Sequence, residues 1–226
     1  MGMAEPWATI TAIPMRDADL LTLTQWLSPA YPVGAFAWSH GLEQAVARGD
    51  VAGANDLAEW LQSVLEHGAG RTDAILLVEA YRADDVVEIA ELAAALAPSR
   101  ERRMETLQQG AAFAATTRAV WGLDVPDMAF PVAVGRAASL AGLPLEAVTQ
   151  VWLQAFLSNL VQAAQRLMPI GQTEGQRILA GLTPAILSVA EAAQAATLDD
   201  IGSATFAVDT ASMQHETAQT ARLFRS

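Results

Sequence analysis

The 226-residue sequence contains no cysteine and no lysine. Without cysteine, the chain has no disulfide, thiolate zinc site or cysteine nucleophile. All thirteen basic residues are arginines, and 25 acidic residues outnumber them, which gives a formal net charge of -12. This negative charge repels phosphate backbones and anionic lipid surfaces, since both are bound through clustered cations. The composition therefore argues against a nucleic-acid-binding protein or a membrane-surface protein.

Sequence signals for export and membrane insertion are also missing. The N-terminus lacks a basic segment followed by an apolar block, so no signal peptide is predicted. Residues 151–170 form the most apolar long segment, but Gln154, Ser158 and Gln162 are among the polar residues that interrupt it. An ordinary membrane span tolerates few such groups. We therefore expect a cytoplasmic protein.

Helical periodicity recurs along most of the chain, and strand-like alternation does not. Apolar residues at 57, 60, 61, 64 and 65 share one helical face, and Asp56 and Glu59 are spaced as a capping box. Similar patterns predict helices over 71–82, 84–96, 100–121, 130–141, 145–168 and 173–196, with Ser99 as a cap and Pro184 as a position for a kink.

These patterns predict an all-α protein of roughly eight to ten helices. No linker divides the chain, so we expect a single compact all-helical domain over residues 17–202. The ends differ from this middle part. Residues 1–16 are mixed and contain proline, and residues 203–226 are polar and weakly periodic. We predict a flexible N-terminal segment and a loosely held C-terminal tail.

The segment SPAYPVGAFAWSHGLEQAV, residues 28–46, contains an adjacent Ser39 and His40. A hydroxyl beside a base suggests a hydrolase, but neighbouring side chains on a helix point about 100° apart. A nucleophile elbow would require the pattern G-x-S-x-G, and Ala37 stands at the first glycine position. We favour Ser39 as the N-cap of a helix that begins at His40, and we predict no catalytic residue.

His40 and Glu43 are also spaced so that both side chains could contact one metal ion. However, the sequence holds three histidines, no cysteine and no H-x-x-x-H pair, so no tight metal site is predicted. A weak, transient contact with a metal ion stays open. Glycine-rich phosphate-binding patterns are absent, so nucleotide chemistry is not predicted.

The prolines and glycines of the same segment predict a chain that turns sharply between two helices. These residues are Pro29, Pro32, Gly34 and Gly41. Its aromatic residues are expected to pack this turn onto the body of the protein. They are Tyr31, Phe36 and Trp38.

The predicted helix 145–168 has an uncharged polar face opposite its apolar stripe. This face consists of Gln150, Gln154, Ser158 and Gln162, with Arg166 at its end. A solvated face usually mixes charges, so this pattern is compatible with a helix covered by another subunit. Ordinary solvent exposure remains the alternative.

The C-terminus places two large apolar residues between cations, in the order Arg222, Leu223, Phe224, Arg225 and Ser226. Aromatic residues and arginine are over-represented among the residues that dominate binding energy. The pattern predicts a segment that binds a partner protein.

Three blocks of the sequence together resemble the family of urease accessory proteins named UreF. The first runs from Leu27 to Phe36 and continues with Ser39, His40, Gly41, Leu42 and Glu43. The second comprises Met168, Pro169, Ile170, Gly171 and Gln172, with Gln176. The third comprises Glu216, Arg222, Leu223 and Phe224. The blocks span most of the chain in the family's order.

The resemblance implies an all-helical protein without catalysis of its own. It implies a homodimer that binds the accessory protein UreD, also called UreH, and recruits the GTPase UreG, so that nickel reaches the urease apoenzyme. Nickel would be handled transiently by the assembly, and no cofactor would be bound tightly. Glu216 and residues 222–225 would contact a partner, and no role is transferred to the imidazole of His40.

Two other functions stay open from the sequence. An arginine of this chain could enter the GTPase site as an arginine finger and raise GTP turnover, although the sequence does not indicate which arginine. Alternatively, the protein could store or carry metal, which requires tight nickel binding by the isolated chain. A turnover assay tests the first function, and equilibrium dialysis tests the second.

Overall fold

The computed structural model describes residues 15–202, 206–218 and 222–225. Within these ranges the regular structure is helical and contains no strand. The α-helices are α1 (Asp17–Trp26), α2 (Leu42–Arg48), α3 (Ala54–His67), α4 (Ala69–Arg82), α5 (Val87–Ala95), α6 (Arg100–Trp121), α7 (Phe130–Ala141), α8 (Leu145–Leu167), α9 (Gln172–Ala195) and α10 (Phe206–Ala218). Two short 3-10 helices, η1 (Ala35–Ala37) and η2 (Leu198–Asp200), lie between them. The predicted all-α fold is confirmed.

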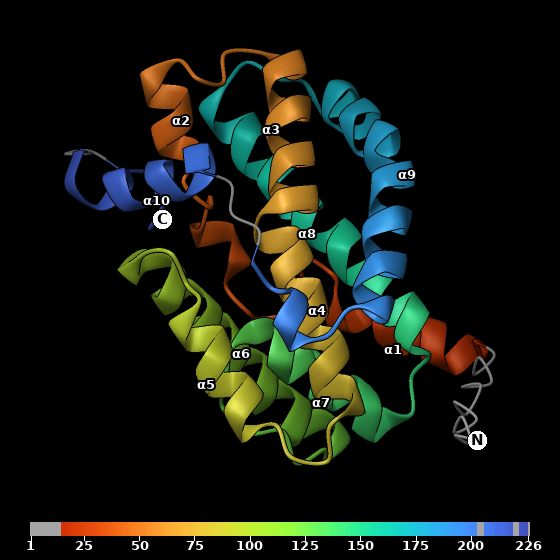
Figure 1. Cartoon of the computed structure of the whole chain (residues 1–226). Helices are drawn as coiled ribbons and strands as arrows, with labels where there is room; N and C mark the ends of the chain where they lie inside the picture. Colours follow the sequence, from red (N-terminus) through yellow and green to blue (C-terminus); the bar gives the residue numbers. More distant parts are fainter. Residues whose placement is uncertain (1–14, 203–205, 219–221, 226) are drawn as a thin grey trace, which may run out of the picture.

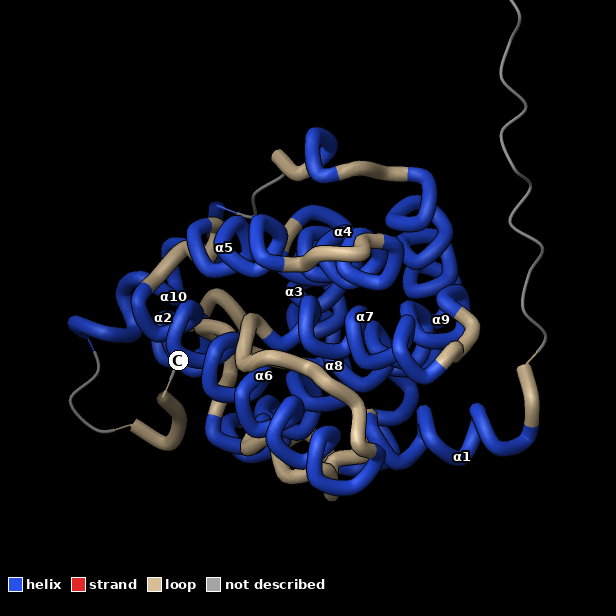
Figure 2. The backbone as a smooth tube through the Cα atoms, turned by 90° about the horizontal axis from the view of Figure 1, so that it is seen from below, coloured by secondary structure: helices blue, strands red, loops and turns tan. Residues whose placement is uncertain are grey.

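Helix α4 lies at the centre of the molecule (Figures 1 and 2). It packs against α3, α7, α8 and α9, and α7 in turn packs against α6. Helices α2 and α10 lie side by side at one end of the molecule, where α10 also contacts α6. The C-terminal helix therefore packs beside an early segment of the chain.

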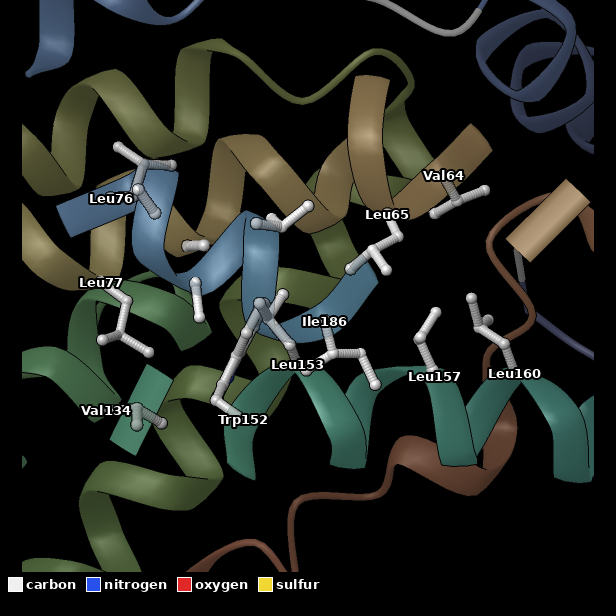
Figure 3. Packing of buried hydrophobic residues seen from close by; sticks show 14 of the residues in the cluster. Val64, Leu65, Leu76, Leu77, Val134, Trp152, Leu153, Leu157, Leu160 and Ile186 are labelled. Carbon is white, nitrogen blue, oxygen red and sulfur yellow. The ribbon is translucent and has the colours of Figure 1, made fainter. Parts of the chain in front are cut away.

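The hydrophobic core explains why α4 is central. Its residues Ala74 to Val78 are all buried, so an apolar run rather than a single stripe faces the neighbouring helices. Figure 3 shows Leu76 and Leu77 of α4 near Val134 of α7, with Leu153 of α8 in the same cluster. These side chains fill the space where α4 crosses α7 and α8.

Glycine permits the close contact between α4 and α7. A Cβ atom built on Gly135 of α7 would lie 2.2 Å from the backbone carbonyl oxygen of Leu77. Side chains in protein interiors are packed too closely to absorb such an overlap without movement of the backbone. Gly135 thus sets the distance between the two helices.

Several predicted helix limits are close to the observed ones, and α7 spans exactly the predicted residues 130–141. The predicted capping box before α3 is wrong. The helix begins at Ala54 after the N-cap residue Gly53, and the Asp56 carboxylate lies inside the first turn, where it accepts the Ala52 N–H at 2.9 Å. The Asp56 carboxylate therefore binds the Ala52 N–H at the start of the helix and does not act as the predicted N-cap.

Helix α9 is continuous through Pro184. By length and composition alone, it is the one helix of the described residues that could cross a membrane. It packs against α3, α4 and α8.

Predictions about the two ends have different outcomes. Residues 1–14 of the predicted N-terminal segment lie outside the described residues. In the predicted C-terminal tail, Phe206–Ala218 form α10, which packs against α2 and α6. The weak apolar periodicity of this segment did not indicate a helix.

Candidate functional site

The turn at residues 28–41 is packed by two of its three aromatic residues. The Tyr31 hydroxyl lies 3.0 Å from the Thr117 hydroxyl, and the side chains of Tyr31 and Trp38 are buried. The prediction that Phe36 packs onto the body of the protein is wrong, because its side chain is 68% exposed. Its ring instead stacks on the guanidinium group of Arg166.

Positive backbone φ angles produce this turn. Gly34 has φ 72°, and its left-handed conformation precedes η1. His40 and Gly41 follow with φ 55° and 76°; a histidine tolerates this region better than most residues with a side chain. A Cβ atom on Gly41 would lie 2.7 Å from the backbone nitrogen of Ser212 in α10. Gly41 therefore serves both the turn and the close approach of the C-terminal helix.

Helix α2 begins at Leu42 after the N-cap residue Gly41, so the predicted start at His40 is wrong. The left-handed conformation of His40 and Gly41 keeps these residues out of the helix. The Ser39 hydroxyl still accepts the Glu43 N–H, at 3.3 Å, and Ser39 is fully buried. Ser39 therefore supports the first turn of α2 from outside the helix.

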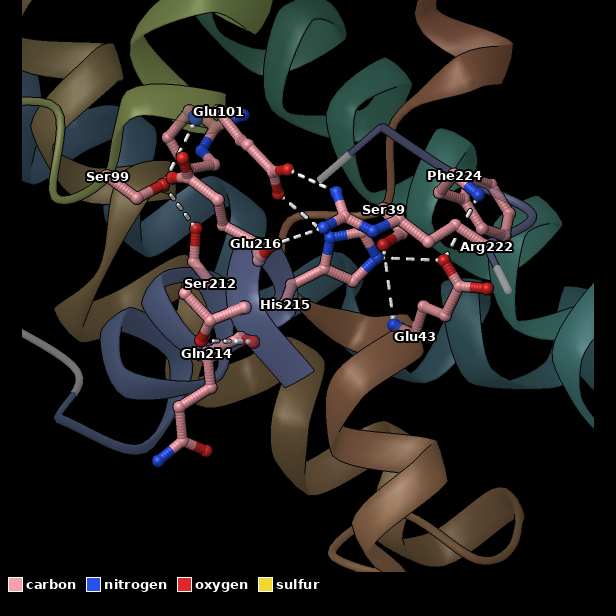
Figure 4. A network of polar contacts seen from close by, with 12 residues as sticks. Ser39, Glu43, Ser99, Glu101, Ser212, Gln214, His215, Glu216, Arg222 and Phe224 are labelled. Carbon is pink, nitrogen blue, oxygen red and sulfur yellow. Dashed lines mark hydrogen bonds and ion pairs between the residues drawn. The ribbon is translucent and has the colours of Figure 1, made fainter. Parts of the chain in front are cut away.

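The carboxylate of Glu43 binds the C-terminal residues (Figure 4). Its two oxygens accept the Leu223 N–H at 2.7 Å and the Phe224 N–H at 3.1 Å. The second oxygen also lies 2.8 Å from Nε2 of His215. Glu43 is itself buried, with 6% of its surface exposed. A buried carboxylate needs such donors, since charge without partners is costly inside a protein.

His215 connects Glu43 to a second carboxylate. Its Nδ1 atom lies 2.8 Å from Glu101 of α6, and the other oxygen of Glu101 lies 2.5 Å from the Arg222 guanidinium. His215 is fully buried, and each of its two ring nitrogens has a carboxylate oxygen as its partner. We call Glu43, Glu101, His215 and the residues 222–225 that they hold the tail-docking site.

The neighbouring contacts of α10 also join it to α6. The Glu216 carboxylate pairs with Arg100 at 2.5 Å, and its backbone carbonyl accepts a hydrogen bond from Arg222. The hydroxyls of Ser99 and Ser212 lie 2.8 Å apart. The side chain of Glu216, a predicted partner-binding residue, is thus engaged within the chain.

The last described residues contact the 28–46 segment directly. The Phe224 side chain is 3% exposed, whereas Leu223 is 68% exposed. The Arg225 N–H donates to the Ala37 carbonyl at 2.8 Å, and the Arg225 guanidinium lies 5.9 Å from the Trp38 ring. The protein's own surface therefore buries the ring of Phe224, one of the residues predicted to contact a partner.

A second polar cluster lies beside the tail-docking site. Nδ1 of His40 is 3.0 Å from Arg102 and 3.1 Å from Glu105, and Arg102 pairs with Glu105. Burial, followed by the charge of Arg102, lowers the pKa of His40. Burial alone would raise the pKa of Glu105, but Arg102 and His40 outweigh it and lower this pKa to about 2. The cluster therefore holds an ionised Glu105 beside Arg102.

Two cavities meet at this cluster. The volumes are about 90 Å³ and about 300 Å³, and His40, Asp73 and Arg102 contribute to the walls of both. Burial raises the pKa of Asp73 to about 7, although the charge of Arg102 opposes this shift. Asp73 is thus a carboxyl group of α4 that lines both cavities beside the polar cluster.

The acidic and histidine side chains of this region do not converge on one ion. The two carboxylates at His215 contact opposite nitrogens of the ring. Across the residues that the structure describes, no group of three His, Asp or Glu side chains is arranged to hold a metal ion. The arrangement is suited to holding a peptide segment through backbone N–H groups.

Comparisons with known proteins agree with the sequence blocks. The UreF family profile matches residues 51–183. The urease accessory protein UreF of Roseobacter denitrificans is 50% identical over 214 residues, covering 94% of this chain and 96% of that protein. Those of Cereibacter sphaeroides strain KD131 and Rhodopseudomonas palustris strain TIE-1 are 54% and 48% identical, over 93% and 98% of this chain and 100% and 99% of those proteins.

The chain belongs to the UreF family. The predicted membership is therefore confirmed, and the chain is similar to proteins named urease accessory protein UreF. The tail-docking site brings together the first and third sequence blocks on which the resemblance was recognised, through Glu43 and residues 222–224.

The second UreF block lies at the connection between α8 and α9. Gly171 is the N-cap residue of α9, and Gln172 begins this helix. Pro169 and Gln176 are exposed, and Gln165 lies 3.5 Å from the Gly171 carbonyl. The block therefore shapes a helix connection, and Arg166 of α8 just before it contacts the other two blocks through Phe36 and Phe224.

The predicted dimer face of this UreF-family protein is partly accessible. Gln154 is exposed to solvent, whereas Gln150, Ser158 and Gln162 are half-buried. Gln150 bonds to Glu146, and Gln162 bonds to Ser158, both within α8. Self-association through this face stays a prediction.

The sequence interpretation missed Glu101, His215 and Arg166 as parts of the site. A signal for His215 exists, because Val208, Ala211, Ser212 and His215 follow helical spacing and all are buried. Half of this face is polar, so the apolar residues alone do not show the helical spacing. Nothing in the local sequence indicates that Glu101 and Arg166 meet residues 222–224, since those contacts span long stretches of chain.

Proposed function

We propose that this UreF-family protein is a non-catalytic scaffold in urease maturation. It binds the UreD-type accessory protein and helps to recruit the GTPase UreG, so that nickel is inserted into the urease apoenzyme. Nickel is handled transiently by the assembly, without a tightly bound cofactor in this chain. Membership of the family supports the general role.

The tail-docking site is the observation that carries the proposal. It places the exposed side chains of Phe36 and Leu223 on a surface built from two distant parts of the chain. The cations Arg166 and Arg225 lie on the same surface, although the chain as a whole is acidic. Aromatic residues and arginine are enriched in protein interfaces, where a few exposed anchors contribute most of the binding energy.

The structure changes which residues are proposed as anchors. Phe224 is buried within the chain and holds the tail in place. Leu223 points its side chain outward while its N–H is bound to Glu43. We therefore assign partner contact to Leu223 and Phe36, and docking of the tail to Phe224.

The test measures capture of the UreD-type protein by the Leu223→Ser variant. We expect binding to weaken by about 2 kcal/mol, as for loss of an interface anchor, with unchanged thermal unfolding because Leu223 is exposed. Nickel-dependent urease activation should fall in parallel. The control is Leu21→Ser, which changes a leucine that is 71% exposed on α1. Equal capture of wild type and Leu223→Ser would refute the proposed surface.

Self-association is a separate part of the proposal. The uncharged face of α8, with Gln154 at its most exposed described position, would form a two-fold contact between two copies in the cytoplasm. This contact would lie opposite the apolar stripe of α8.

A further inference from the structure

Arg166 makes the most unusual contact of the tail-docking region. Its Cζ atom lies 3.6 Å from the centroid of the Phe36 ring and 4.0 Å from that of Phe224. Its Nη2 atom also donates to the Phe36 carbonyl at 2.6 Å. One guanidinium from the last turn of α8 therefore contacts an exposed ring of η1 and a buried ring of the C-terminus.

The surroundings of this guanidinium favour stacking over solvation. Burial lowers the pKa of Arg166, an effect that Glu43 partly opposes. Within the described residues, its Nε atom has no hydrogen-bond partner. A planar guanidinium keeps favourable contact with two aromatic faces when water is displaced, and cation–π attraction grows as the cation is desolvated.

The hydrogen bonds of residues 223–225 are made by backbone N–H groups. Glu43 accepts the N–H groups of Leu223 and Phe224, and the Ala37 carbonyl accepts the N–H of Arg225. Such backbone bonds form with almost any sequence, so they hold the tail without selecting its side chains. Burial in the hydrophobic cluster favours an apolar side chain at position 224, and the stack on Arg166 adds a preference for an aromatic one.

From these contacts we infer that Arg166 is a positioning residue that couples the docked tail to the exposed Phe36 ring. The same guanidinium stabilises both rings, so loss of either ring weakens its hold on the other. Coupling of this kind is reciprocal: a partner that fixes Phe36 also strengthens docking of the tail, by the same factor. Only this last step, which involves a partner, rests on the proposed function.

The experiment follows hydrogen exchange of the Leu223 and Phe224 amides in the full-length protein. We expect Arg166→Gln to speed their exchange by at least tenfold, and Arg166→Lys to speed it nearly as much, because an ammonium cannot stack between two rings. Exchange in α4 should be unchanged. The matched control is Arg177→Gln on α9, an exposed arginine with no ion pair or hydrogen bond among the described residues.

The second variant, Phe36→Ala, separates coupling from a merely structural role of Arg166. It removes a ring 188 positions away from Phe224 in the sequence and keeps the carbonyl that Arg166 binds. We expect the tail amides to exchange at least threefold faster, whereas Leu21→Ala on α1 should have no effect. Unchanged tail exchange in Arg166→Gln or in Phe36→Ala overturns the coupling.

These outcomes are independent of the partner test. The exchange experiment uses the protein alone, so its failure counts against Arg166 and not against the scaffold role. Full partner capture by Leu223→Ser would count against the proposed surface and leave the coupling in place. Loss of capture in Arg166→Gln together with faster tail exchange supports both.

Discussion

The crossing of α4 and α7 and the tail-docking site are held together by opposite means. At the crossing, buried apolar side chains surround a glycine that lets two backbones approach. At the tail-docking site, two buried carboxylates hold a histidine, an arginine and backbone N–H groups. Apolar packing has little directionality, whereas buried charges require each partner at its place.

This difference determines what each region contributes. The crossing belongs to a core whose helices are long and mutually packed, and burial of apolar surface is the main favourable contribution to folding. The tail-docking site joins distant segments through a few directional contacts. If one partner is lost, the remaining charge is buried without a partner, and its full desolvation penalty destabilises the site. The α4–α7 crossing is suited to a rigid core. The tail-docking site is suited to a segment whose position responds to its surroundings.

The largest expected effect follows from filling the space at Gly135. In Gly135→Ala, the new methyl group meets the Leu77 carbonyl oxygen at 2.2 Å unless the helices move apart. We expect the free energy of unfolding to fall by about 3 kcal/mol, as for an overpacked core. Urea denaturation measures this change.

The matched control for this variant is Gly181→Ala on α9. Gly181 is exposed, and a Cβ atom there would meet nothing within 4 Å. Alanine in an open helical position stabilises by up to about 1 kcal/mol relative to glycine. Equal free energies of unfolding for the two variants would show that the α4–α7 contact is not close.

The two regions also differ in how far the sequence predicts them. Apolar spacing predicted α7 to the residue, because a buried helix face is a local pattern. The tail-docking site was predicted only in parts. Glu43 and Phe224 were named, but their contact depends on the left-handed turn at His40 and Gly41 and on the place of α10. These features depend on the packing of whole helices, which no local pattern contains.

An intermediate effect is expected from Glu43→Gln. The amide keeps the size of the side chain, but it loses the charge that binds His215 and one of the oxygens that accept the tail N–H groups. We expect the free energy of unfolding to fall by about 2 kcal/mol, as for a lost bond to a charged group. The tail amides should exchange faster than those of α4.

The surface pair of Arg118 and Asp127, at 2.9 Å, provides the control for this charge change. Asp127 is exposed, and surface ion pairs contribute at most about 1 kcal/mol. Asp127→Asn should therefore have a smaller effect on unfolding and none on exchange of the tail. If Glu43→Gln resembled Asp127→Asn in both measurements, the tail-docking site would not depend on its charges.

The last effect depends on pH and concerns Asp73, which belongs to the central helix α4 and lines cavities that reach the polar cluster of His40, Arg102 and Glu105. Burial raises its pKa from 3.8 to about 7, with Arg102 opposing the shift and Glu105 adding to it. The folded state thus holds the Asp73 proton more tightly than the unfolded state. Its contribution to stability is present below pH 4 and is lost as the pH rises through 7.

Asp73→Asn replaces this carboxyl group by a neutral amide of similar size. Relative to wild type, the variant should gain stability between about pH 4 and pH 7 and keep a constant advantage above that range. The measurement is urea denaturation at a series of pH values, with the exposed Asp199→Asn as a control that should show no such rise. A stability difference that did not change with pH would mean that the pKa of Asp73 is the same in the folded and unfolded states, so that its place beside the cavities does not raise it.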